Sequence, residues 1–481
     1  MKISSIRRQS IIYLGSTIAF TIIGFISTIY FAHTLGPALL GAYFLFLAYF
    51  GIFNLIGDGG FGSAAVKRIS EGKEQNEYFS AFVFLRIILL TLAILVLLIM
   101  EPYLKDVTSS GIFFWLLLAL IISVFSGISG TGVYGAGKVG IFQVSGFLDI
   151  LLRFLFQIAA VFLGFGVAGL TGGFIGGLIV GGIANLRYLD LKIIRFRLSH
   201  IKNLTSFSFW IFLTASGSLV FNYADTILIG FFMNNADVGI YRTAFQLTSV
   251  ATFTTLAFHT VLYPKISNWA AQGQFSKIDA SLARAFTYSL FLAIPTCIGG
   301  WILGEKLLYF LYGAAFIAGA KPLFFLLLAQ IVNVFMYLGT MCLTALNKPK
   351  DAFWITVFAS VINILLNFAL IPVWGITGAA VATLIAMTLN ASGVLILLSR
   401  IIILKLEYKP VKNILYSTFV MGIFILTVYY FLPLNHVLSL VGLVIAGAFL
   451  YLLVLFKLDR EIHDEIRDII ISLGIAWPRG L

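Results

Sequence analysis

The chain has 481 residues, of which 60% are hydrophobic and only 10% are charged. Soluble domains carry about a quarter charged residues, so a soluble globular protein and a disordered chain are both excluded. The composition instead predicts an all-α polytopic membrane protein. The formal net charge is +12. We attribute it to membrane topology and not to nucleic-acid binding, because Lys and Arg collect in the cytoplasmic loops of membrane proteins.

About 20 apolar residues are needed for a helix to cross a bilayer. The sequence predicts about fourteen such spans, at residues 10–32, 39–63, 81–100, 111–132, 141–163, 164–186, 207–232, 238–262, 281–301, 322–345, 352–371, 375–398, 414–432 and 437–456. The two closest pairs of spans are divided only by tight turns, at Gly166 and at Pro372–Gly375. The first span is too long for a secretory signal, so we expect it to be retained as a helix.

The positive charges predict the orientation of these spans. If both termini are cytoplasmic, 25 of the 31 Lys and Arg residues fall in inner segments, 3 in outer loops and 3 within spans. This bias indicates a multi-pass protein of a plasma membrane with cytoplasmic termini. It also argues against nucleic acid as a partner, because the basic residues are spread over all the inner loops.

Two parts of the chain repeat the same landmarks. Gly41-Ala-Tyr43 begins the second span and Gly239-Ile-Tyr241 begins the eighth, at an offset of 198 residues, and a lysine follows each glycine by 26 residues, at Lys67 and Lys265. Gly166-Val-Ala-Gly169 and Gly375-Ile-Thr-Gly378 also match, at an offset of 209 residues. The repeat predicts two parallel six-helix lobes related by a pseudo-two-fold axis along the membrane normal, an architecture that transporters use for alternating access.

The expected domains follow from this repeat. They are an N-terminal six-helix lobe (1–186), a basic cytoplasmic linker (187–206), a C-terminal six-helix lobe (207–398), two additional spans (399–456) and a cytoplasmic amphipathic tail (457–481). The tail is expected to lie along the inner membrane interface or to dock a partner such as a sugar-assembly enzyme.

Several local motifs suggest a family. Leu35-Gly36-Pro37 before Gly41-Ala-Tyr43, and Asp225-Thr-Ile-Leu-Ile-Gly230 before Asp237-Val-Gly-Ile-Tyr241-Arg242-Thr-Ala244, resemble the polysaccharide-transporter branch of the multidrug/oligosaccharidyl-lipid/polysaccharide (MOP) exporter superfamily, the Wzx-type flippases. The resemblance implies a V-shaped, two-lobe fold like that of the multidrug and toxin extrusion (MATE) transporters. It implies movement of polyprenyl-(pyro)phosphate-linked oligosaccharide between leaflets for cell-surface polysaccharide assembly in a prokaryote. It further implies coupling to an H⁺ or Na⁺ gradient, with no cofactor.

Six ionisable residues lie within the predicted spans, where charges are costly and face a cavity or a partner. They are Asp58, Arg86, Asp149, Arg153, Asp225 and Arg242. In one interpretation they form three ion pairs that only neutralise each other. In the other, Arg153, Arg242 and Arg86 bind a pyrophosphate, because guanidinium groups offer paired donors to phosphate oxygens. Asp149, Asp225 and Asp58 then release the arginines or take up the coupling ion.

Other classes of function compete with the flippase. A multidrug or cation antiporter of the same superfamily is the main alternative, although three arginines within spans favour an anionic cargo. A membrane glycosyltransferase or polymerase needs acidic residues outside the membrane, and the longest loops here are short, so we expect a transporter and not an enzyme. No His or Cys cluster has metal-binding spacing, so the sequence predicts neither a catalytic nor a metal site.

Overall fold

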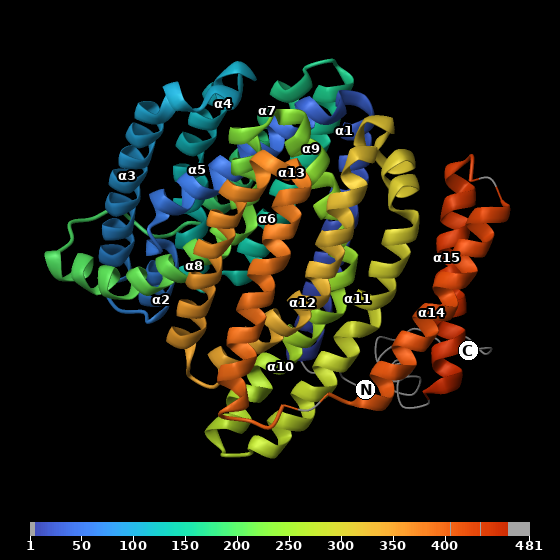
Figure 1. Cartoon of the computed structure of the whole chain (residues 1–481). Coiled ribbons are helices and arrows are strands. Elements are labelled where there is room, and N and C mark those ends of the chain that lie inside the picture. Colours follow the sequence, from blue (N-terminus) through green and yellow to red (C-terminus); the bar gives the residue numbers. More distant parts are fainter. Residues whose placement is uncertain (1–4, 405, 433, 460–481) are drawn as a thin grey trace. The chain divides into compact units, whose positions relative to one another are not determined.

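The computed structural model describes residues 5–404, 406–432 and 434–459 (Figure 1). Within these ranges the chain consists of α-helices and short 3-10 helices with no β-strand, which confirms the all-α fold class. The helices are α1 (Ser5–Asp58), α2 (Phe61–Ser70), α3 (Gln75–Met100), η1 (Glu101–Tyr103), α4 (Lys105–Ser109), α5 (Ile112–Gly135), α6 (Val139–Phe162), α7 (Gly166–Leu186), α8 (Leu198–Phe232), α9 (Asn235–Leu247), η2 (Thr248–Thr252), α10 (Phe253–Ala271), α11 (Phe275–Tyr312), η3 (Ala314–Gly319), α12 (Ala320–Ala345), α13 (Pro349–Ser399), α14 (Tyr408–Phe431) and α15 (Val437–Leu458). From residue 460 onward, the expected amphipathic tail lies outside the described residues.

The helices are long and apolar enough for a membrane protein. Among the described residues, ten helices could cross a bilayer by length and composition. One of them, α13, contains two of the expected spans, 352–371 and 375–398, and the first two expected spans fall largely within α1. The polytopic membrane fold is therefore confirmed, whereas the number fourteen stays a prediction.

The expected span 238–262 is not one continuous helix. It is formed by α9, η2 and α10 in succession. Within η2, the hydroxyl of Thr248 donates to the carbonyl of Phe245 (2.7 Å), and that of Thr252 donates to the carbonyl of Ser249 (2.8 Å). Hydroxyl groups that bond to nearby backbone compete with the α-helical pattern, which explains the local tightening into a 3-10 turn.

Packing divides the chain into two compact units, Ile26–Arg242 and Met1–Phe25 with Thr243–Leu481. In the first unit α7 packs against α5 and α6, and α2 packs against α3, α5 and α8. In the second unit α12 packs against α11 and α13, and α14 and α15 pack together and against α11. The lobe boundaries expected from the repeat stay a prediction.

Two glycines reverse the chain where the sequence predicts tight turns. Gly166 and Gly375 have left-handed φ angles of 55° and 58°, which glycine adopts without steric cost. A Cβ atom built on Gly378 would lie 2.3 Å from the carbonyl oxygen of Leu370, eight residues earlier. A straight helix would place these residues about 12 Å apart along its axis. The chain therefore folds back on itself inside α13, even though the helical assignment is continuous there.

The starts of the second and eighth expected spans meet in a reciprocal contact. A Cβ atom on Gly41 would lie 1.7 Å from the carbonyl oxygen of Asn235, and one on Gly239 would lie 2.1 Å from the carbonyl oxygen of Pro37. Both pairs, Gly41 with Gly239 and Pro37 with Asn235, are related by the repeat offset of 198 residues. Reciprocal contact between equivalent positions is the mark of a two-fold interface, so the internal repeat has a physical counterpart here.

A proline in α11 is compensated by a side chain from α15. Pro295 has no N–H group, so it cannot donate to the carbonyl of Phe291 four residues earlier. The Tyr451 hydroxyl donates to that carbonyl instead, at 2.8 Å. In a membrane an unsatisfied carbonyl costs several kcal/mol, so this hydrogen bond fixes α15 beside the proline of α11.

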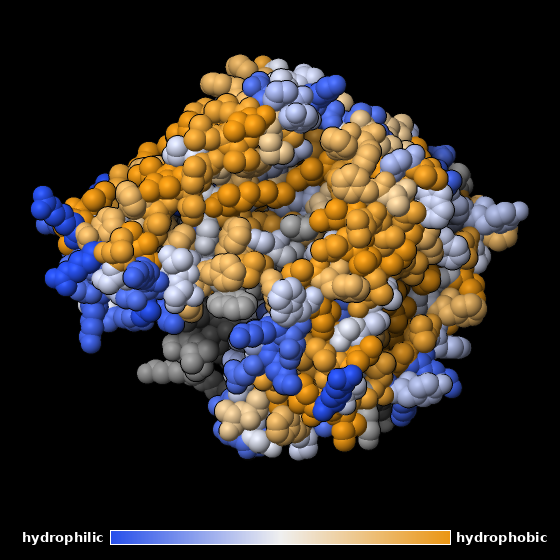
Figure 2. Space-filling model, turned by 60° about the vertical axis from the view of Figure 1, so that its left-hand side comes forward, coloured by the Kyte–Doolittle hydropathy of each residue, from blue (hydrophilic) through white to orange (hydrophobic). Residues whose placement is uncertain are grey.

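Large hydrophobic side chains remain on the surface. Figure 2 shows them spread over broad areas of one face, with hydrophilic side chains gathered in separate patches. Ile99 on α3 is 74% exposed and Leu438 on α15 is 80% exposed. Soluble proteins rarely expose contiguous apolar areas of this extent, and lipid is the solvent that makes them stable.

Candidate functional site

Asp58 and Arg86 form an enclosed ion pair between α1 and α3. Arg86 Nη1 lies 2.6 Å from Asp58 Oδ1, and Nη2 donates to Asn54 Oδ1 at 2.8 Å. The side chain of Arg86 is only 5% exposed. Gly127 makes room for it, because a Cβ atom there would lie 3.0 Å from Arg86 Nη2. Arg86 is thus held by an aspartate and an asparagine in the interior of the helix packing.

Asp149 and Arg153 form a second pair along one face of α6. Arg153 Nη2 donates to Asp149 Oδ1 at 2.8 Å, as the four-residue spacing predicts. The guanidinium also lies over the ring of Phe174, 4.3 Å from its centre. A Cβ atom on Gly177 would lie 2.5 Å from Asp149 Oδ1, so a glycine of α7 provides the space for this pair. Arg153 is 22% exposed, which is more accessible than Arg86.

Asp225 and Arg242 each have a polar neighbour of their own. The Tyr241 hydroxyl donates to Asp225 Oδ2 at 2.6 Å, and Asp225 is buried. Arg242 donates to the carbonyl of Asn222 at 3.3 Å. Its guanidinium lies 5.7 Å from the ring centres of both Phe44 and Tyr223, so two aromatic rings set its orientation.

Two tyrosines accompany these charges, and both are landmarks of the repeat that were not among the predicted site residues. Tyr43 accepts a hydrogen bond from Gln157 Nε2 (2.8 Å), which also donates to the carbonyl of Leu170 (2.8 Å). Tyr43 and Tyr241 are separated by the repeat offset of 198 residues, and both are buried with a polar side chain on the hydroxyl. That equivalence was the signal in the sequence that could have identified them.

Two of the three arginines belong to one connected group of side chains. The Phe174 ring under Arg153 contacts the ring of Phe46, with centres 5.3 Å apart. The Tyr43 ring lies 6.1 Å from Phe46 and 6.3 Å from Phe44, and Phe44 lies beside Arg242. Arg153 and Arg242 are therefore linked by a row of contacting aromatic rings within the unit Ile26–Arg242, whereas Arg86 is held separately by Asp58. The roles expected for the three arginines in substrate binding stay predictions.

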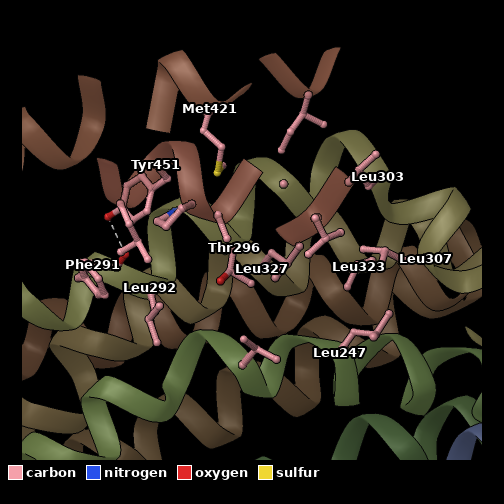
Figure 3. Close-up of a pocket in the computed structure, with 18 of the residues that line it drawn as sticks. Leu247, Phe291, Leu292, Thr296, Leu303, Leu307, Leu323, Leu327, Met421 and Tyr451 are labelled. Atoms are coloured by element: carbon pink, nitrogen blue, oxygen red, sulfur yellow. Dashed lines mark hydrogen bonds between the residues drawn. The ribbon is translucent and has the colours of Figure 1, made fainter. Parts of the chain in front are cut away.

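The other unit contains an apolar cavity of about 640 Å³. In Figure 3 side chains from α11 and α12 lie beneath residues of the C-terminal helices α14 and α15. Leu303, Leu307, Leu323 and Leu327 line it together with Met421 of α14, and Tyr451 reaches Phe291 at one end. The two additional spans expected at the C-terminus thus form part of the wall of a lipophilic site.

Comparison with protein families identifies the chain. A family model described as "Polysaccharide biosynthesis protein" matches residues 6–269, which is more than half of the chain, and a MatE model matches residues 211–369. Two proteins of Haloferax volcanii are similar. The "Probable flippase AglR" is 28% identical over 484 residues, covering 98% of this chain and all of that protein. The "Probable low-salt glycan biosynthesis flippase Agl15" is 26% identical over 401 residues, covering 83% of this chain and 84% of that protein.

Solved structures share the fold. The lipid II flippase MurJ in an inward closed conformation superposes with a TM-score of 0.79 at 20% identity, covering 94% of this chain and 99% of that one. An inward-facing multidrug resistance transporter of the MATE family gives a TM-score of 0.66 at 17% identity, covering 79% of this chain and 94% of that one. The resemblance that the sequence motifs indicate is therefore confirmed. The chain is a multi-pass membrane protein with the MOP-superfamily fold, and it belongs to the polysaccharide biosynthesis protein family.

Proposed function

We propose that this protein is a flippase that carries a polyprenyl-(pyro)phosphate-linked oligosaccharide from the cytoplasmic to the outer leaflet of a plasma membrane. The family, and two relatives named as flippases that align over most of this chain, support a transporter and not an enzyme. In this proposal both termini are cytoplasmic, as the bias of basic residues indicates, and two lobes alternate access to the substrate. The product serves cell-surface polysaccharide or glycan assembly.

The linked pair Arg153 and Arg242 is the observation that carries the proposal. A diphosphate needs fixed cationic donors, and a guanidinium stays charged at any physiological pH and binds phosphate oxygens in pairs. Stacking on Phe174 orients Arg153, and the rings of Phe44 and Tyr223 orient Arg242. We propose these two as the first contacts of the diphosphate. Arg86 is a third contact only if Asp58 releases it during transport.

The apolar cavity suits the other end of such a substrate. A polyprenyl chain is a flexible hydrocarbon, and the walls formed by α11, α12, α14 and α15 are almost wholly aliphatic and aromatic. Because lipid tails are as apolar as these walls, a polyprenyl chain can move from the bilayer into the cavity without a large cost in free energy. The cavity therefore matches the chemistry of the tail of such a substrate, as the arginine pair matches the chemistry of its head.

The aspartates provide a means of coupling transport to an ion gradient. Asp149 holds Arg153, Asp58 holds Arg86, and Asp225 accepts a hydrogen bond from Tyr241, which precedes Arg242 in the chain. Uptake of H⁺ or Na⁺ by an aspartate would weaken its attraction for the arginine and free the guanidinium for phosphate. Release of the ion on the other side would restore the pair and expel the diphosphate.

Transport by the purified full-length chain in proteoliposomes tests the proposal. Wild type should move a fluorescent polyprenyl-diphosphate sugar across the bilayer, and Arg153→Ala and Arg242→Ala should each lower the rate about tenfold or more, the effect of losing a hydrogen bond to a charged group. Arg284→Ala is the matched control, because Arg284 is a solvent-exposed arginine outside this group. Arg153→Lys keeps the charge and shows whether a loss reflects folding.

A multidrug or cation antiporter is the second candidate, favoured by the MatE match over residues 211–369 and the MATE-like fold. The same proteoliposomes distinguish the two. If wild type moves no lipid-linked sugar but extrudes an organic cation against a proton or sodium gradient, the flippase proposal is wrong. In that case neutralising Asp149 or Asp225, and not the arginines, should abolish transport.

A further inference from the structure

A short extended segment between α7 and α8, residues 189–197, is here called the strap. Its backbone is held against the start of α3. The N–H of Lys192 donates to Asn76 Oδ1 at 2.9 Å, and the N–H of Ile194 donates to Ser80 Oγ at 2.8 Å. These two bonds, from alternate residues, hold the strap in an extended conformation, although it belongs to no helix and to no strand.

The position of the strap along α3 sets its depth. Asn76 and Ser80 lie in the first turns of α3, and the apolar stretch of this membrane-spanning helix begins between them. The first apolar turn of a spanning helix lies at the boundary between headgroups and hydrocarbon. Figure 1 shows the strap and the first part of α8 beside this end of α3, with that part of α8 running across the direction of α3. The strap therefore lies at the membrane–water interface.

The inner side of the strap is already filled. Leu189, Leu191 and Phe196 pack against a buried cluster that includes Phe79 and Leu204. The outer side carries two kinds of residue that are seldom exposed together. Its basic side chains and its aliphatic ones both face outward, with Ile193 72% exposed and the adjoining Leu198 69% exposed.

The strap has a net positive charge. Lys192, Arg195 and Arg197 are all exposed. The acidic residue of the segment, Asp190, forms an ion pair with Lys138, which also donates to the carbonyl of Tyr188 at 2.8 Å. The acid is therefore neutralised from within the protein, while the basic groups face outward.

We propose that the strap binds the headgroups of anionic phospholipids in the leaflet that faces it, which the charge bias identifies as the cytoplasmic one. Aliphatic side chains such as Ile193 enter the acyl boundary, and Lys192 and Arg195 contact the phosphates, the pattern of an interfacial basic segment. A phospholipid bound there steadies the connection between α7 and α8, which joins the two expected lobes. The inference concerns a lipid of the membrane and does not depend on what the protein transports.

Lipid retention by the purified full-length chain tests this inference. The protein in detergent is incubated with equal amounts of phosphatidylglycerol and phosphatidylcholine, washed, and the bound lipids are counted by mass spectrometry. Wild type should retain phosphatidylglycerol in excess. Lys192→Gln with Arg195→Gln should lower that preference by about fivefold for each charge removed. The control, Lys265→Gln with Lys277→Gln, removes two exposed charges from another inner segment and should leave the preference unchanged.

Two further arms separate charge from folding. Lys192→Arg with Arg195→Lys keeps both charges and should retain the preference, whereas 1 M salt, with a screening length of about 3 Å, should abolish it in wild type. The inference is overturned if the double glutamine variant keeps the wild-type ratio of the two lipids. It is also overturned if the control pair loses as much preference as the strap pair, because the effect would then be one of overall charge.

Discussion

The reciprocal contact of Gly41 and Gly239 allows a quantitative prediction. An alanine methyl at Gly41 would start 1.7 Å from a backbone oxygen, and one at Gly239 would start 2.1 Å from another, while ordinary contact begins at 3.4 Å. The helices must therefore separate by about 1.7 Å in the first case and about 1.3 Å in the second. The opposing atoms are backbone and cannot rotate away. We expect each substitution to lower the free energy of unfolding by ~1–3 kcal/mol, the usual cost of overpacking.

Thermal unfolding in detergent micelles measures the effect, with Gly146→Ala as the control. Gly146 lies in α6, where a Cβ atom would meet nothing within 4 Å. Alanine is the better helix former by up to ~1 kcal/mol, so Gly146→Ala should leave the unfolding midpoint unchanged or raise it. Gly41→Ala and Gly239→Ala should both lower it.

The double variant tests the two-fold geometry itself. A single separation of the helices relieves both clashes, so Gly41→Ala with Gly239→Ala should cost clearly less than the two single effects added together. The reasoning is refuted if either single variant is as stable as Gly146→Ala, because the close approach would then not exist. If the loss of stability in the double variant equals the sum of the two single losses, the two contacts adjust independently and do not form one interface.

Two further predictions concern buried polar groups. Tyr451→Phe should destabilise the protein by ~1–3 kcal/mol, because the carbonyl of Phe291 loses its donor. The same substitution should have little effect in the Pro295→Ala variant, where residue 295 regains an N–H donor. Equal losses of thermal stability in the wild-type chain and in Pro295→Ala would disprove the compensation. Asp58→Asn should cost ~3 kcal/mol, since Arg86 is 5% exposed and would keep its charge without a counterion. If Asp58 is the counterion of Arg86, the double variant Arg86→Leu with Asp58→Asn should recover most of the lost stability. An unchanged unfolding midpoint in Asp58→Asn alone would contradict this role.

Features that depend on local sequence could be predicted without the structure. A run of about 20 apolar residues forms a helix in lipid because its backbone must bond internally. The expected spans accordingly fall on helical segments, although 238–262 is divided among α9, η2 and α10. Asp149 and Arg153 meet because they are four residues apart on one helix. Gly166 and Gly375 turn the chain because only glycine adopts their φ angles without strain.

Features that join distant segments were decided only by the tertiary structure. The bond from Tyr451 to the carbonyl of Phe291 links positions 160 residues apart, and no periodicity in the sequence indicates it. The same holds for Arg242, whose aromatic neighbours come from α1 and α8. The physical reason is that hydropathy selects helices that are nearly alike in composition. Which faces of those helices meet depends on individual glycines, hydroxyls and charges, whose partners are chosen only when the helices pack.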